Sequence, residues 1–356
     1  MGKRDDAQMA LAAMAAAAGT GYASGRELVL FFAQLGRAGW IGVALAPVVF
    51  GLLTAMLCRL AARAGGEGLA GMFRGLLGPR AGAVAGALQG TLLALTAVVM
   101  LWGAGELGAL ALPLRFGFLW GAGLALLAAL LLNLGGMRAL PWAGLAVMAV
   151  GVALYAGLAL DARPPRIYLR GDVRLALEGS VPAAILLALA YGSMNACLAA
   201  AVAARFGGRA RPLRAGALCG AMLFALLLCA NLAVARGGRQ LLCQAMPTVV
   251  LAARWGLAGF WLCVGFGFLC AVSTLAATLG GLIGLLRTSR HGLWGVAPAL
   301  LAAAACALRG VPGAVSASYP AVGWLCAALM LAMACRMDSG LGVLSRAFGG
   351  VRRAKR

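Results

Sequence analysis

The sequence predicts an all-α polytopic membrane protein with ten transmembrane helices, arranged as two inverted repeats of five helices each. Hydrophobic residues make up 63% of the 356 residues, and charged residues make up only 11%. Apolar runs of about 20 residues, the length that a helix needs to cross a bilayer core, recur along the chain. The first and sixth runs carry glycines and polar residues at their centres, which predicts that these two helices are discontinuous.

The apolar runs place the ten spans in chain order. Their predicted limits are 8–36, 38–62, 81–111, 116–135, 138–160, 180–204, 213–235, 257–286, 291–308 and 318–336. The basic start of the chain resembles a signal peptide, but two acids follow it and the apolar run continues past any cleavage point. A retained first span is therefore favoured.

The placement of basic residues predicts the orientation of the chain. Of the 30 lysines and arginines, 19 lie at the two ends and in the loops that follow even-numbered spans. The positive-inside rule then places both termini in the cytoplasm. The net charge of +21 thus reports orientation and not a nucleic-acid partner, because the arginines lie in short loops. The predicted parts are a first repeat at 1–160, an extracellular loop at 161–179, a second repeat at 180–336 and a basic cytoplasmic tail at 337–356.

The centre of the first span reads GTGYASG, and the centre of the sixth reads AYGSMNA. Glycine costs about 1 kcal/mol relative to alanine inside a helix. An unwound segment also frees backbone groups, which a transporter can use to bind its solute. Unwinding is favoured over close packing for the first span, and the two interpretations are evenly balanced for the sixth. The expected substrate-binding residues are Gly19, Thr20, Gly21, Ser24, Gly25, Tyr191, Gly192, Ser193 and Asn195.

Two charges, Arg26 and Glu27, directly follow the first centre. A charge in the middle of a membrane costs roughly 3 kcal/mol on insertion scales. Adjacent helical side chains diverge by about 100°, so each charge needs its own partner, and Glu106 in the third span is the partner expected for Arg26. Glu27 is then a coupling residue that carries a proton or binds a substrate ammonium group. The alternative is that both charges only lock the half-helix onto its neighbours.

Ser273 and Thr274 lie on a stripe of small residues in the eighth span. Two adjacent hydroxyl groups are suited to completing an oxygen cage for a small cation. Serine and threonine in membrane helices also commonly bond to carbonyl groups one turn earlier in their own helix. On these residues alone, the second interpretation is favoured.

The stretch GTGYASGRELVLFF resembles the first-span signature of the YkvI-like family of bacterial membrane proteins, Gly-x-Gly-Phe/Tyr-Ala-Ser-Gly-x-Glu followed by Phe-Phe. That family is related to the amino acid–polyamine–organocation superfamily, whose members share the LeuT fold. The resemblance implies a LeuT-like protein of the bacterial plasma membrane with a sodium site between the first and eighth spans. Its implied ligands are the carbonyls of Ala15, Ala18 and Cys270 and the hydroxyls of Ser273 and Thr274. The sixth centre departs from the pattern, because Gly192 stands where relatives often have Tyr-Asn.

These observations together predict a secondary active transporter of a small polar solute, an amino acid or a related compound, coupled to sodium or protons by alternating access. A membrane receptor or sensor subunit with the same fold is the alternative. An enzyme is not expected, because the single histidine, His291, lies where a loop meets the start of the ninth predicted span, and no aspartate lies in a span. The expected partners are a small-molecule substrate and the lipid bilayer, with no nucleic acid and no cofactor other than a sodium ion.

Overall fold

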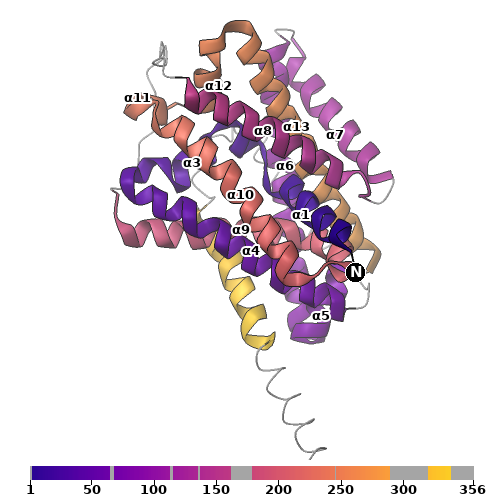
Figure 1. Cartoon of the computed structure of the whole chain (residues 1–356). Helices are drawn as coiled ribbons and strands as arrows, with labels where there is room; N and C mark the ends of the chain where they lie inside the picture. The colour runs from indigo at the N-terminus through magenta and orange to yellow at the C-terminus, as the bar shows by residue number, and fades with distance from the viewer. Residues whose placement is uncertain are drawn as a thin grey trace, which may run out of the picture.

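The structure is a computed structural model that describes residues 2–64, 68–112, 115–134, 137–161, 179–244, 246–288 and 320–337. These residues form helices joined by short turns (Figure 1). The α-helices are α1 (Lys3–Ala17), α2 (Thr20–Ser24), α3 (Arg26–Phe31), α4 (Gly39–Arg63), α5 (Gly68–Leu77), α6 (Pro79–Ala111), α7 (Gly117–Leu134), α8 (Leu140–Leu160), α9 (Val181–Phe206), α10 (Pro212–Ala235), α11 (Gly238–Leu242), α12 (Pro247–Ala252) and α13 (Gly256–Thr288). A further helix, Pro320–Met337, follows. Short 3₁₀ turns cover Ala33–Ala38, Gly207–Arg209 and Ala253–Trp255.

Eight helical segments in the described part of the chain are long and apolar enough to cross a membrane. They correspond to the second to eighth and the tenth predicted spans. The first predicted span is divided into α1, α2 and α3, each too short to cross by itself. The ninth predicted span, most of the predicted extracellular loop and nearly all of the tail lie outside the described residues.

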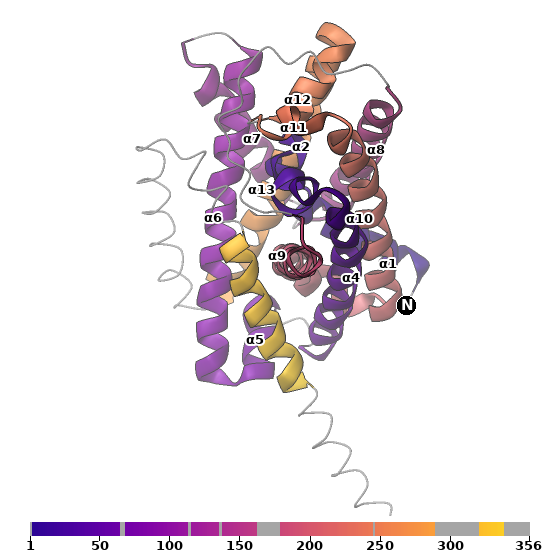
Figure 2. The same ribbon diagram turned by 90° about the vertical axis from the view of Figure 1, so that its left-hand side faces the viewer.

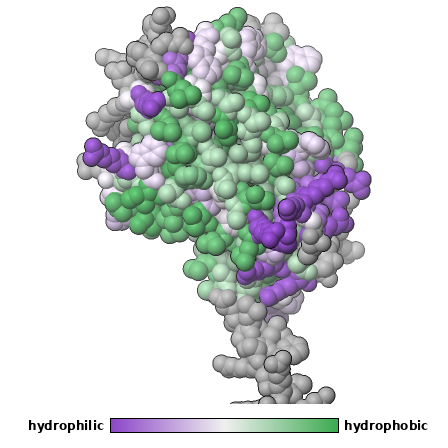
Figure 3. All heavy atoms as spheres, in the orientation of Figure 1, coloured by the Kyte–Doolittle hydropathy of each residue, from purple (hydrophilic) through white to green (hydrophobic). Residues whose placement is uncertain are grey.

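The outer surface of the helix bundle suits lipid. On α7, the buried residues recur every fourth position and are all small, while large leucines such as Leu127 and Leu131 are exposed. Gly108 and Gly121 let α6 and α7 approach until an added Cβ would meet the opposite backbone. Small residues at helix contacts and large apolar residues outside are the pattern of membrane helices. Figure 3 shows the apolar surface along the bundle, with hydrophilic side chains gathered near the N-terminus.

Helix α9 lies at the centre of the bundle, where Figure 2 looks almost along its axis. Helices α1, α4 and α13 all pack against it. Its second half is alanine-rich and buried around most of its circumference. A helix that is apolar on all sides belongs in a core, and α9 therefore forms one wall of any site near the middle of the protein.

The prediction that the sixth span is discontinuous is wrong, because α9 runs without a break from Val181 to Phe206. Gly192 serves close packing instead: a Cβ added there would lie 2.8 Å from the side chain of Val49 and 2.9 Å from the carbonyl oxygen of Ala46 on α4. The Asn195 amide nitrogen donates to the carbonyl of Tyr191 in the same helix, at 2.9 Å. Both residues therefore support a continuous helix.

The orientation predicted from the arginines has a direct test. A cysteine introduced between 161 and 179 should react with a membrane-impermeant maleimide applied to intact cells. One introduced between 205 and 213 should react only after permeabilisation, because no acid stands among the arginines of that loop, whereas Asp161, Asp172 and Glu178 nearly balance those of 161–179. The parent protein, with its ten native cysteines, gives the background labelling. The opposite labelling pattern would reverse the orientation.

An ion pair ties the start of the chain to the turn between α9 and α10. The Asp6 carboxylate accepts hydrogen bonds from the backbone amide of Arg211 at 2.8 Å and from its guanidinium at 2.6 and 2.9 Å. Burial alone would raise the pKa of Asp6, but the hydrogen bonds and charge of Arg211 outweigh it, so the pKa lies below its ordinary value. A charge-assisted network of this kind stabilises by about 1.5–3 kcal/mol.

We therefore expect Asp6→Asn to lower the thermal midpoint of the purified protein at pH 7. Because the folded pKa is depressed, this contribution is present above the unfolded pKa of about 4 and is lost as the pH falls through the folded value. The difference between parent and variant should thus shrink in strongly acidic buffer. Tryptophan fluorescence during heating measures it, and Asp5→Asn is the matched control, because Asp5 bonds only to the exposed amide of Gly2. Equal midpoints for the two variants would contradict the assignment.

Candidate functional site

The first predicted span breaks where the sequence indicated. Helix α1 ends at Ala17 and α2 begins at Thr20. Ala18 has φ −85° and ψ 79°, and Gly19 has φ −82° and ψ −174°, so both have left the helical conformation. A Cβ added at Gly19 would lie 3.0 Å from the methyl group of Met100 on α6. The chain therefore passes α6 at a point where there is little room for a side chain.

The break redirects three backbone amides, those of Gly19, Thr20 and Tyr22. They donate to the carbonyl of Ala17 (3.1 Å), the sulfur of Met100 (3.4 Å) and the carbonyl of Gly19 (3.1 Å). In a continuous helix they would donate to the carbonyls of Ala15, Ala16 and Ala18. Those carbonyls thus leave the helical hydrogen-bond ladder, as a backbone ligand set requires.

A second break at Gly25 separates α2 from α3. Gly25 has φ +82°, a left-handed conformation that favours glycine, and an added Cβ would lie 2.5 Å from the Thr248 hydroxyl on α12. The Tyr155 hydroxyl on α8 donates to the Tyr22 carbonyl at 2.7 Å and lies 3.1 Å from the Thr248 hydroxyl. The short α2 is therefore held from α8 and from α12.

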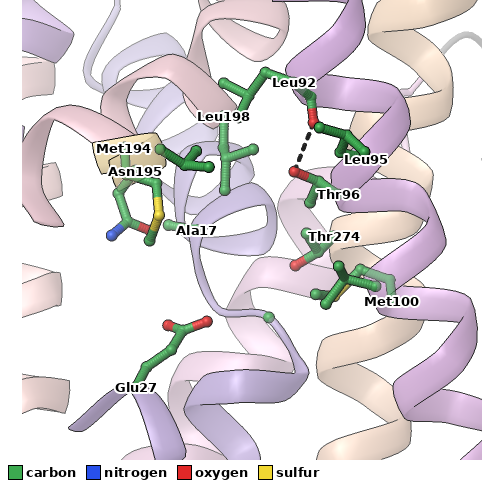
Figure 4. A pocket seen from close by; sticks show the side chains of 13 residues that line it. Ala17, Glu27, Leu92, Leu95, Thr96, Met100, Met194, Asn195, Leu198 and Thr274 are labelled. Atoms are coloured by element: carbon green, nitrogen blue, oxygen red, sulfur yellow. Dashed lines mark hydrogen bonds between the residues drawn. The ribbon is translucent and has the colours of Figure 1, made fainter. Parts of the chain in front are cut away.

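A cavity of about 120 Å³ lies beside the first break. Its walls come from the α1–α2 junction and from α3, α6, α9, α13 and the last described helix. Figure 4 shows Glu27 at one end of the cavity and Leu92 and Leu198 towards the other. The lining residues are Ala17, Gly19, Glu27, Leu92, Leu95, Thr96, Val99, Met100, Met194, Asn195, Leu198, Thr274 and Val322.

Besides the hydroxyls of Thr96 and Thr274, two buried side chains with acceptor oxygens line this mostly apolar cavity. The side chain of Glu27 is only 4% exposed, and its carboxylate lies so close to Gly21 that an added Cβ there would overlap it. Asn195 is 1% exposed, and its side-chain oxygen has no hydrogen-bond partner among the described residues. The cavity thus offers a carboxylate and an amide oxygen, both acceptors, in surroundings that strengthen electrostatic attraction.

The residues of the implied sodium site gather only in part. The Thr274 hydroxyl crosses from α13 to donate to the Ala15 carbonyl at 3.1 Å, directly at the broken end of α1. The Ser273 hydroxyl instead donates to Cys270 in its own helix, at 3.0 Å. The Thr274 hydroxyl and the Ala15 carbonyl therefore lie next to each other, whereas the Ser273 hydroxyl is directed into its own helix. The described residues contain no cluster of three or more histidine, cysteine or acidic side chains suited to a metal.

The remaining predicted substrate residues do not line the cavity. Ser24 donates to the Gly21 carbonyl and accepts from the Arg26 amide, so it caps the second break. Tyr191 packs between Phe31 and Phe32, with ring centroids 4.9 and 5.1 Å away. Of the other expected residues, Thr20 faces Met100 and Gly103 on α6, Ser193 is buried, and Gly21, Gly25 and Gly192 serve the close packing described above.

The expected ion pair between Arg26 and Glu106 does not form. Within the described part of the chain, no salt bridge joins these residues, and Nη1 of Arg26 is buried without a hydrogen-bond partner. The backbone explains this result: the left-handed turn at Gly25 redirects α3, so the direction of the Arg26 side chain no longer follows from a continuous first helix.

Sequence reasoning missed the apolar part of the lining, which comes mainly from α6 and α9. Helix α6 has 33 residues and is almost uniformly apolar, and it contributes Leu92, Leu95, Val99 and Met100 to the lining. Nothing in that pattern separates a cavity wall from a lipid-facing surface. Met194 and Leu198 could have been found from Asn195, because they lie within one turn of it on the same helix.

A membrane transporter of known structure shares this arrangement of helices. Two mutants of the manganese transporter of Eremococcus coleocola match with TM-scores of 0.53 and 0.55 at 18% and 17% identity, over 92% of this chain and 77% of each of theirs. The same transporter in complex with an aromatic bis-isothiourea substituted compound matches at 0.53 and 16% identity, over 92% of this chain and 74% of that one. No protein-family model and no curated protein sequence matches the chain. At this identity the likeness establishes the fold alone, which is that of a membrane transporter.

Proposed function

We propose that this protein is a secondary active transporter of a small solute bearing an amino group, an amino acid or a close relative. The observation that carries the proposal is the cavity at the broken first helix, with buried Glu27 at one end and the unpartnered oxygen of Asn195 on its wall. The proposal includes ten helices in two inverted repeats that rock around this site, in a bacterial plasma membrane with both termini cytoplasmic.

The chemistry of the cavity suits an ammonium group attached to an apolar body. Opposite charges about 4 Å apart attract by about 4 kcal/mol at an effective dielectric constant of 20. Asn195 supplies a second acceptor for an N–H group, and the leucine, valine and methionine side chains suit an aliphatic portion. The volume of about 120 Å³ far exceeds the about 10–15 Å³ that one water needs.

Two features support coupling to an ion. The Thr274 hydroxyl and the Ala15 carbonyl supply adjacent oxygens at a helix C-terminus, where the helix dipole attracts cations. Glu27 is a buried carboxyl group beside the cavity and is able to carry a proton across. The first feature favours sodium and the second favours protons, and both belong to the same site.

A divalent metal ion is the second candidate substrate. One solved transporter with this fold is a manganese transporter, and Glu27 and Asn195 line the cavity together with Met100 and Met194. Carboxylate and carbonyl oxygens suit manganese. Against this candidate, most of the lining is aliphatic.

Reconstitution into proteoliposomes tests the proposal. Uptake of radiolabelled L-leucine, glycine and Mn²⁺ is measured with and without a sodium gradient and a pH gradient, with protein-free liposomes as the control. We expect gradient-driven uptake of an amino acid and a raised thermal midpoint in its presence, because a ligand stabilises the state that it binds. Stabilisation without uptake would indicate the receptor alternative, and uptake of manganese alone would overturn the proposal.

A further inference from the structure

A second hollow, of about 470 Å³, lies at the ends of α4 and α9 and beside α5 and α13. We call it the vestibule. Small residues create its space, since most of its lining is glycine and alanine. The lining residues are Ala61, Ala62, Gly68, Leu69, Met137, Ala201, Ala204, Arg205, Gly208, Arg209, Gly280, Gly281 and Gly284.

Two arginines without a partner among the described residues make the vestibule electropositive. Arg205 and Arg209 are both exposed, and neither forms a hydrogen bond or ion pair with any residue that the structure describes. Nearby Arg211 differs, because Asp6 neutralises it. No acidic side chain belongs to the described lining. The two guanidinium groups are therefore available to an anionic group that enters the hollow.

The vestibule and the central cavity lie in series along the same two helices. On α9, Leu198 lines the cavity and Ala201 lines the vestibule, about 4.5 Å further along the axis. On α13, Thr274 lines the cavity and Gly281, two turns further along the helix, lines the vestibule. Close helix packing separates the two hollows in this structure: a Cβ added at Gly281 would lie 2.6 Å from the Ala201 side chain and 2.9 Å from that of Leu93.

We propose that the vestibule is the access route between the central cavity and one aqueous side, and that Arg205 and Arg209 select solutes that carry a carboxylate. This inference rests on the proposed transport function and narrows its substrate class to zwitterions. Rings of fixed positive charge attract anionic groups and repel free cations in a narrow passage. A zwitterion is attracted to both charged regions, through its carboxylate to the arginines and through its ammonium group to Glu27. A cation without a carboxylate is attracted only to Glu27.

The charge of the vestibule is measurable without knowing the substrate. Gly284 lines it, and an added Cβ there would meet nothing within 4 Å, so Gly284→Cys is accommodated. The labelling rates are measured with anionic methanethiosulfonate ethylsulfonate and with its cationic trimethylammonium analogue, each relative to a free thiol. We expect the anionic reagent to be favoured, and Arg205→Gln with Arg209→Gln to reduce that preference about tenfold. Arg59→Gln with Arg63→Gln is the matched control, because these exposed arginines at the end of α4 lie outside the lining. An unchanged preference in the vestibule variant would overturn the inference.

The substrate class is tested by flux in the reconstituted protein, with L-leucine, L-leucinamide, which lacks the carboxylate, and Mn²⁺. We expect leucine flux to exceed leucinamide flux, and the double arginine variant to reduce the leucine flux at least tenfold. The same variant should not reduce the flux of leucinamide and should raise it, because the positive charges that repel this cation are gone. Equal fluxes that the variant does not alter would overturn carboxylate selection but leave an amine transporter standing. Flux of manganese alone would overturn both proposals. If no solute crosses, the transport proposal fails, and the labelling preference still decides whether the vestibule selects by charge.

Discussion

Replacing Glu27 with glutamine should weaken binding of an ammonium-bearing solute by about 100-fold, the largest functional loss that we expect from a single substitution. The Glu27 side chain is 4% exposed and lines the central cavity. Its attraction for an ammonium group at about 4 Å is worth several kcal/mol, and each 1.4 kcal/mol corresponds to a tenfold change in affinity. Glutamine has nearly the same shape, so the fold should persist. Thermal shift and flux, measured with L-leucine between pH 5 and pH 8, follow the effect.

Three outcomes of this substitution separate the roles of Glu27. Loss of binding at every pH identifies the carboxylate as the ammonium site. Retained binding with a lost pH dependence identifies it as the proton carrier. An unfolded protein, or an unchanged pH profile, would show that Glu27 is scaffold. Glu106→Gln is the matched control, because Glu106 is a half-buried acid on α6 that does not line the cavity.

Replacing Thr274 with valine should remove the response to sodium, if sodium is the coupling ion. Valine keeps the shape of threonine but lacks the hydroxyl that reaches the Ala15 carbonyl across the break. The lost hydrogen bond should also destabilise the α1–α13 contact by about 1 kcal/mol. The response is measured as the shift in thermal midpoint, and in leucine flux, when choline is exchanged for sodium.

The neighbouring hydroxyl supplies the control for this substitution. Ser273 bonds within its own helix, to Cys270, so Ser273→Ala should leave more than half of the sodium response. Equal losses in the two variants would place both hydroxyls on the ion. A full response in the Thr274 variant would remove this position from the site, and a parent protein indifferent to sodium would leave protons as the coupling ion.

The break in the first helix was predictable because several local signals coincide there. Gly19, Gly21 and Gly25 are spaced among polar residues and are followed by charges, and the structure breaks at Gly19 and again at Gly25. The centre of the sixth span also combines a glycine with polar residues, yet α9 is continuous. The difference lies on α4, where Val49 and the Ala46 carbonyl occupy the space that Gly192 leaves. A contact between segments far apart in the sequence thus accounts for Gly192, and the local composition of the sixth span does not reveal such a contact.

Most of the cavity lining was beyond sequence reasoning for a related reason. Leu95 and Val99 on α6 face the cavity, whereas Leu88 on the same helix is 40% exposed on the surface. In a membrane both environments are apolar, so hydrophobicity cannot distinguish an inner face from an outer one. The vestibule is even more difficult to predict from the sequence. Its space exists because glycines, Gly208 and Gly284 among them, have no side chain to fill it. Whether such a glycine leaves a hollow or allows close packing depends on which helices meet at it.

The two longest helices, α6 and α13, each contain 33 residues and pack against each other. At 1.5 Å per residue they are about 50 Å long, against a hydrocarbon core of about 30 Å. A helix so much longer than the bilayer must tilt or extend into the headgroups, and its tilt changes with bilayer thickness. Because Met100 on α6 and Thr274 on α13 both line the cavity, we expect acyl-chain length to alter the dimensions of the site itself. The lipid in which this protein is reconstituted is thus a variable of its chemistry, comparable with pH or salt.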